Sequence, residues 1–120
     1  MTANLAAHYI VLFTLAVLLE APAYLLMFWR RIPTRRLLLA AGLVNLITNP
    51  LSNFLYLMWD TPIALLELVV VLAEAGLLLV FLRCSVGRAA ALSLVANLTS
   101  WLLGGPLYTS IMRLIARVII

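Results

Sequence analysis

Acidic side chains inside apolar stretches are the residues of this chain that could do chemistry. The sequence of 120 residues has four acidic residues, and Glu20, Glu67 and Glu74 lie within long apolar runs. A charged, unpaired carboxyl group surrounded by hydrocarbon costs about 3 kcal/mol or more. Such a group needs a proton, a bound cation or hydrogen-bond donors. Buried carboxyls of this kind are typical of ion and proton pathways.

Two asparagines complete a polar layer with two of these glutamates. Glu20, Asn45, Glu74 and Asn97 each lie nine or ten residues from the arginine that bounds their apolar run. At about 1.5 Å per helical residue they share a depth of roughly 13–15 Å, near the middle of a bilayer. Because an amide can donate to a carboxyl, we expect a Glu–Asn contact within each pair of neighbouring helices.

Further polar residues share helix faces with this layer. Asn45, Thr48, Asn49 and Ser52 follow helical spacing, and Glu67 and Glu74 are seven residues apart on one face. Asp60, beyond them, would extend that face into a stepwise route for a cation or proton. Hydrogen bonding between helices alone is the competing interpretation. The predicted ligand-binding residues are Glu20, Glu74, Asn45, Asn97, Glu67, Asn49 and Thr48.

Four apolar runs must position these side chains. The chain is 67% hydrophobic and 10% charged, and a soluble domain of this size could not hide so much apolar surface from water. The runs cover about 5–29, 37–59, 62–82 and 89–103, the last extending at most to 108, and each can cross a bilayer. We predict an all-α integral membrane protein with four transmembrane helices in one domain, 1–120.

The basic residues indicate orientation rather than a polyanionic partner. All eight are arginines, and six lie in two short clusters between apolar runs. Under the positive-inside rule, loops 30–36 and 83–88 are predicted to be cytoplasmic. The expected location is a cell membrane, as a multi-pass protein of the bacterial inner membrane. A nucleic-acid interface would need basic residues gathered on a solvated face, so no nucleic-acid partner is expected.

The rare polar residues recur at matching positions in the two halves of the chain. When Glu20 is aligned with Glu74, and Arg36 with Arg88, Asn45 falls on Asn97. The pattern predicts two tandem helical hairpins, repeat 1 about 5–59 and repeat 2 about 62–108, related as a parallel repeat with a pseudo-twofold axis along the membrane normal. Chance similarity between leucine-rich segments is the alternative.

The C-terminal segment has a different pattern. Thr109, Arg113 and Arg117 recur every four residues, which predicts an amphipathic segment, 107–120, lying in the membrane interface. Gly104, Gly105 and Pro106 are expected to end the fourth span. If the chain turned back there, the tail would lie on the cytoplasmic side.

The predicted function is a proton-linked transporter or channel for a cation or cationic solute. The alternative is a structural or accessory subunit of a larger membrane complex, whose polar layer packs helices or supports a cofactor. The expected partners are the lipid bilayer and either copies of this chain or other membrane subunits. Enzyme motifs such as HExxH, a Ser–His pair or a Gly-rich phosphate loop are missing from the sequence. We therefore predict no catalytic residues and no enzyme activity. The sequence contains no evident cofactor-binding motif. The ligand expected in the polar layer is a bound cation, and the sequence does not identify a metal.

Overall fold

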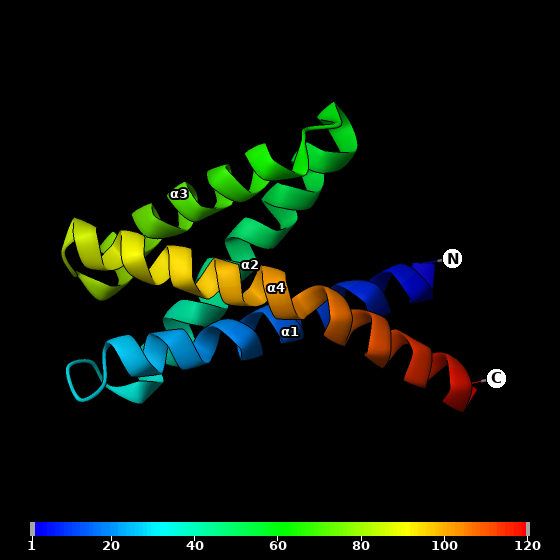
Figure 1. Ribbon diagram of the computed structural model, residues 1–120, viewed down its shortest axis with the longest axis horizontal. Coiled ribbons are helices and arrows are strands. Elements are labelled where there is room, and N and C mark those ends of the chain that lie inside the picture. The colour runs from blue at the N-terminus through cyan, green and yellow to red at the C-terminus, as the bar shows by residue number, and fades with distance from the viewer. Residues whose placement is uncertain (1, 120) are drawn as a thin grey trace.

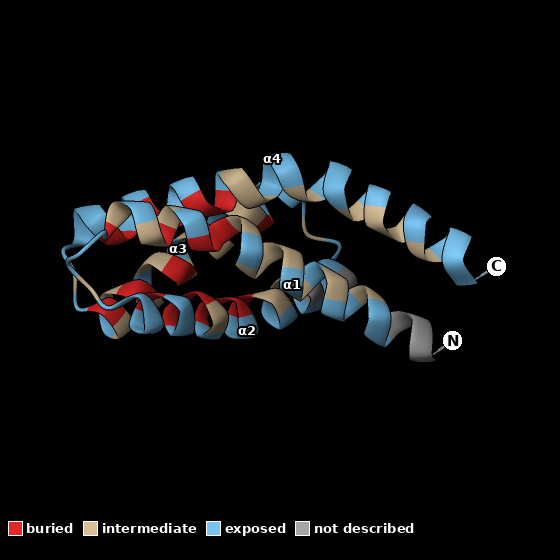
Figure 2. Ribbon diagram, turned by 90° about the horizontal axis from the view of Figure 1, so that it is seen from below, coloured by how far each residue is buried: buried red, intermediate tan, exposed pale blue. Residues whose placement is uncertain are grey.

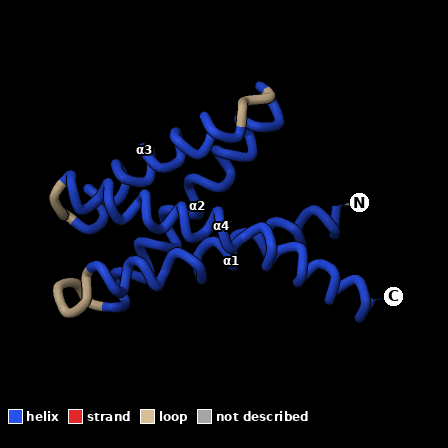
Figure 3. Tube along the Cα trace, viewed as in Figure 1, coloured by secondary structure: helices blue, strands red, loops and turns tan. Residues whose placement is uncertain are grey.

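The computed structural model describes residues 2–119, and the regular structure in them is helical (Figures 1 and 3). The helices are α1 (Thr2–Met27), α2 (Thr34–Trp59), α3 (Ile63–Leu82) and α4 (Val86–Ile119). All four are long and apolar enough to cross a membrane. The predicted all-α class with four candidate spans is therefore confirmed, and it indicates a multi-pass membrane protein.

Left-handed residues and prolines set the boundaries between helices. Asp60 (φ 46°) follows α2, and Arg83 (φ 50°) follows α3 and donates its N–H to the Leu79 carbonyl at 3.1 Å. A left-handed residue turns the chain out of the helix. Pro33 and Pro62 stand immediately before α2 and α3, where a missing N–H costs little. These short connections make consecutive helices antiparallel.

Two helices begin earlier than the predicted loops 30–36 and 83–88 allow. The observed connections are 28–33 and 83–85, so Arg35 and Arg36 lie in the first turn of α2. At α4, the Ser85 hydroxyl accepts the Arg88 N–H at 3.3 Å. A serine in this position caps a helix N-terminus, and the helix therefore begins directly after Ser85.

The helices pack in chain order around the bundle, and α4 closes the ring against α1. We call the end with connections 28–33 and 83–85 the arginine end, and the opposite end, with connection 60–62, the Asp60 end. Figure 1 shows that the tip of the α2–α3 hairpin diverges from the termini of α1 and α4 at the Asp60 end, whereas the buried core lies toward the arginine end. The bundle is packed at one end and splayed at the other.

The buried core fills the arginine half of the bundle (Figure 2). Several of its members are alanines, which let helix backbones approach closely where lipid gives no hydrophobic drive to associate. Arg36 also donates to the Phe81 carbonyl at 3.1 Å, tying the start of α2 to the end of α3. The core residues are Tyr24, Phe28, Leu37, Ala40, Ala41, Val44, Leu78, Leu82, Ala89, Leu92 and Ala96.

The fourth helix differs from its prediction. α4 runs without interruption from Val86 to Ile119, with Pro106 inside it, so the chain does not turn back at Gly104–Gly105 and no separate tail segment forms. Proline removes one backbone donor, but a helix held on both sides can continue through it. The stripe of Thr109, Arg113 and Arg117 is exposed on the distal part of the same helix.

The outer surface is apolar. Leu18, Leu72 and Val80 are 63%, 64% and 70% exposed, although each lies within a candidate span. Trp29 and Trp59, at the ends of apolar runs, are 65% and 70% exposed. A lipid bilayer suits such a surface, and exposed tryptophans at span ends are typical of interfacial anchors.

Candidate functional site

The first predicted Glu–Asn contact joins α1 to α2. The Asn45 amide donates to Glu20 Oε2 at 2.7 Å and to the Ala41 carbonyl, one turn earlier in its own helix, at 3.0 Å. Glu20 and Asn45 are 2% and 1% exposed. Both amide hydrogens are therefore used inside the protein, and one of them meets the carboxyl group.

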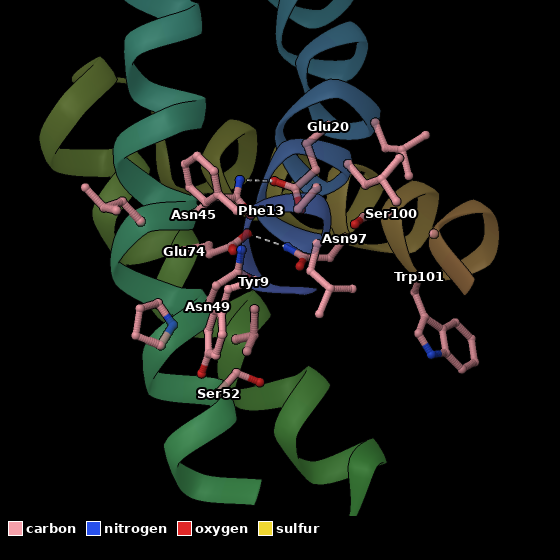
Figure 4. A pocket seen from close by; sticks show the side chains of 18 of the residues that line it. Tyr9, Phe13, Glu20, Asn45, Asn49, Ser52, Glu74, Asn97, Ser100 and Trp101 are labelled. Atoms are coloured by element: carbon pink, nitrogen blue, oxygen red, sulfur yellow. Dashed lines mark hydrogen bonds between the residues drawn. The ribbon is translucent and has the colours of Figure 1, made fainter. Parts of the chain in front are cut away.

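The second contact joins α3 to α4 with the same pattern. The Asn97 amide donates to Glu74 Oε2 at 2.5 Å and to the Ser93 carbonyl, again four residues earlier, at 2.8 Å. Glu74 is buried, and so is Asn97. Each hairpin thus contains one carboxyl group that is held by an amide from its second helix (Figure 4).

Thr48 links the two hairpins. Its hydroxyl lies 2.8 Å from Glu74 Oε1 and 2.9 Å from the Val44 carbonyl. A hydroxyl has one hydrogen, so it can donate to only one of these oxygens at a time. An ionised Glu74 would take that hydrogen, whereas a protonated Glu74 would donate to Thr48 and leave its hydrogen for Val44. The direction of the hydrogen bond between the hairpins therefore depends on the protonation state of Glu74.

The Thr48 link can be tested by Thr48→Val, which keeps the side-chain shape and removes the hydroxyl. We expect a loss of about 1 kcal/mol in the free energy of unfolding, because a buried carboxyl oxygen loses its partner. Thr99→Val is the matched control, since the Thr99 hydroxyl donates to the Val95 carbonyl of its own helix. Unfolding in mixed detergent measures both variants, and equal losses would contradict the assigned role of Thr48.

A cavity of about 610 Å³ opens beside this layer, and all four Glu and Asn side chains line it (Figure 4). The walls come from the splayed halves of the helices and include Tyr9, Phe13 and Trp101. Among the described residues that line the cavity, none is basic. The buried core lies on the arginine side of the Glu–Asn layer, and the rest of the cavity lies on the Asp60 side. The carboxyl groups are therefore at the floor of a pocket that is closed toward the arginine end.

The floor has hydrogen-bond acceptors to spare. Among the side chains that the structure describes, which exclude those of residues 2–5, 53 and 57, none donates to Glu20 Oε1 or to the side-chain oxygens of Asn45 and Asn97, although these three residues are nearly buried. The hydroxyl of Tyr24 is buried and has no hydrogen-bond partner among the same described side chains. Three free acceptors therefore face the cavity, with an unpartnered hydroxyl buried nearby.

A hydrogen bond holds α1 against α4 farther from the core. His8 Nδ1 and the Tyr108 hydroxyl are bonded, and their ring centroids are 5.8 Å apart. The contact is half-buried and crosses between helices at the chain's two terminal segments. It keeps these two helices together as one wall while the α2–α3 hairpin diverges.

The structure brings the predicted site residues together. Glu67 and Asn49 line the cavity with the Glu–Asn layer, and Thr48 is buried against Glu74. The stepwise route through Asp60 is not formed, because Asp60 adopts a left-handed conformation after α2 and is exposed, while α3 begins only at Ile63. No group of three or more His, Cys, Asp or Glu side chains in the described residues could hold a metal ion.

Part of the cavity wall was not predicted from the sequence. Trp101 and Gly105 line it, and helical spacing from Asn97 (i+4 and i+8) could have placed them on the same face. Tyr24 lies four residues after Glu20, also on one face, but nothing in the spacing indicates that its hydroxyl has no partner. No protein-family model, curated protein sequence or solved structure matches this chain.

Proposed function

We propose that this protein is a proton-linked transporter or channel for a cation or cationic solute. The observation that carries the proposal is the pair Glu20 and Glu74 at the floor of one cavity, each bonded to an amide. Among the described lining residues no basic side chain is present to neutralise them. A proton or a cation from outside must do so. The role assigned to the site is binding and not catalysis.

The charges of the two carboxyl groups make proton and cation binding alternatives. Two ionised carboxyls in apolar surroundings repel each other, and an amide neutralises neither of them. Two protons, or one proton and one monovalent cation, make the pair neutral. Binding of a cation therefore displaces a proton, and a proton displaces the cation. This exchange is the basis of the proposed coupling.

Closure of the arginine side supports transport. The cavity extends from the Glu–Asn layer toward the Asp60 end, and tightly packed residues such as Leu78, Leu92 and Ala96 close the arginine side. A carrier that alternates its access needs a site that reaches one side while a seal blocks the other. The Thr48–Glu74 hydrogen bond lies at the boundary between the two, where a change of protonation acts on both hairpins.

The matching hydrogen bonds support an internal duplication. In both hairpins an asparagine donates to the glutamate of the preceding helix and to the carbonyl four residues earlier. We propose two parallel repeats about a pseudo-twofold axis along the membrane normal. Under the positive-inside rule, the arginine end is cytoplasmic in a bacterial inner membrane. The broad apolar surface suits self-association, and we propose a homo-oligomer.

The proposal is tested in protein-containing vesicles with an imposed pH gradient. We expect a proton flux that depends on the protein. This flux should increase when a cation that the protein binds or transports is present on the opposite side of the vesicle membrane. A pH-sensitive dye inside the vesicles measures it. Asp60→Asn is the matched control, because this acidic residue is exposed and lies outside the cavity, and its flux should equal the native flux. Flux no greater than in protein-free vesicles would overturn the proposal.

The accessory-subunit alternative has one observation in its favour. The cavity is lined by all four helices in the half of the bundle toward the Asp60 end, where a helix of a partner could lie. Purification in a mild detergent separates the two functions. A stoichiometric membrane partner together with no flux would favour the accessory role.

A further inference from the structure

The chemistry of the cavity indicates which cations it takes. We infer that the ligand is a protonated amine with N–H donors and an apolar or aromatic body, and not a hydrated metal ion or a quaternary ammonium. This inference deepens the proposed function and rests on it. It depends on two further observations, the free acceptors at the floor and the apolar walls.

The free acceptors at the floor match the N–H donors of an ammonium group in number and kind. Glu20 Oε1 and the side-chain oxygens of Asn45 and Asn97 are three acceptors without donors in the described residues, and all three residues line the cavity. A primary ammonium has three N–H donors, as lysine does. It can therefore donate one hydrogen bond to each of the three acceptors. Its positive charge neutralises the negative charge that remains when the carboxyl pair holds one proton. A quaternary ammonium supplies the charge and leaves the acceptors unpaired.

The same floor suits a metal ion poorly. Calcium takes about six to eight oxygen ligands and magnesium about six. The three free oxygens at the floor are too few by themselves, and the other polar lining residues, Glu67, Asn49, Ser52 and Ser100, are single side chains spread over three helices. In the described residues, moreover, no cluster of three metal-binding side chains exists. A bare inorganic cation would have to keep most of its water in an apolar pocket.

The walls indicate the rest of the ligand. The lining includes Tyr9, Phe13, Leu46 and Trp101, which offer apolar surface and aromatic faces that attract cations. A volume of about 610 Å³ is in the range of roughly 300–1,000 Å³ typical of sites for drug-sized molecules. It is roughly twenty times the volume of one water molecule. An ion alone would leave most of this space unfilled.

Direct binding tests this inference without any transport measurement. The native protein in lipid nanodiscs is titrated calorimetrically with 4-phenylbutylammonium, with its N,N,N-trimethyl counterpart and with the neutral 4-phenyl-1-butanol. We expect the ammonium to bind at least tenfold more tightly than either of the others. Equal affinity for the trimethyl compound would overturn the N–H requirement, and equal affinity for the alcohol would overturn the cation requirement.

Variants test each half of the site. Glu20→Gln is expected to weaken ammonium binding at least tenfold, while Asp60→Asn binds like the native protein. Trp101→Ala, on the cavity wall, is expected to weaken binding of 4-phenylbutylammonium and to leave methylammonium binding unchanged. If Glu20→Gln fails to fold, the Trp101 comparison still decides whether the apolar body sits in this cavity. Native affinity in both variants would overturn the site.

The outcome is separable from that of the proposed function. Protein-dependent proton flux stimulated by sodium or potassium, with no binding of the ammonium, would overturn this inference and leave cation transport standing. Ammonium binding without flux would support the site and overturn transport. Absence of both ammonium binding and proton flux would overturn this inference and the proposed function together.

Discussion

Glu20→Gln and Glu74→Gln are each expected to reduce proton flux in reconstituted vesicles to the level of protein-free vesicles, at least a hundredfold below the native protein. Glutamine retains an oxygen that can accept the Asn45 or Asn97 hydrogen bond, so the contact between helices survives. What it lacks is an exchangeable proton and a negative charge. The substitution therefore removes the coupling chemistry and keeps the architecture.

The flux measurement needs evidence that the variants are folded. We expect helical content and the detergent unfolding midpoint of both variants to stay close to native, because a neutral amide is easier to bury than a charged carboxyl. Glu20→Asp, which keeps the carboxyl group on a shorter side chain, should retain intermediate flux. Native flux in the two glutamine variants would mean that the layer only holds helices together, and would favour the accessory-subunit function.

Ala89→Leu is expected to have the largest effect on stability. Ala89 is fully buried in the core at the arginine end, where α4 meets its neighbours. Additional methylene groups in such a packed site typically cost about 1–3 kcal/mol, and here they must push helices apart. In lipid the helices are held by close packing and hydrogen bonds, so separation also lengthens the Glu–Asn contacts.

The neighbouring residue supplies a matched control. Ala90 is exposed on the same helix, so Ala90→Leu adds the same atoms where they meet lipid or detergent. Thermal unfolding in detergent should show a lower midpoint for Ala89→Leu and a native midpoint for Ala90→Leu. If the two variants were equally stable, the alanine-lined packing at the arginine end would not be what holds the bundle together.

Residue counting predicted the Glu–Asn layer because it depends on few quantities. Helices rise by a fixed distance per residue, short connections make neighbours antiparallel, and polar residues are scarce in apolar runs. Those facts suffice to bring Glu20 to Asn45 and Glu74 to Asn97. They also give the number of helices, since each run is long enough to span.

Other features depend on packing and backbone geometry, which counting does not supply. Asp60 does not extend the polar face of α3, because it adopts a left-handed conformation at the end of α2. α4 continues through Pro106, although Gly104, Gly105 and Pro106 favour the end of a helix. The cavity follows from the divergence of the α2–α3 hairpin from α1 and α4, and the position of Trp101 in its wall depends on that packing.

The length of α4 has a consequence for the bilayer itself. Its 34 residues give an axis of about 51 Å, against a hydrocarbon thickness of about 30 Å. Tilting alone would need an inclination of more than about 50°, beyond the roughly 40° that membrane helices reach. The final turns, with Arg113 and Arg117, must therefore emerge among the lipid headgroups. Bilayer thickness thus determines how much of this helix emerges, and hydrophobic mismatch becomes a means of favouring one membrane over another.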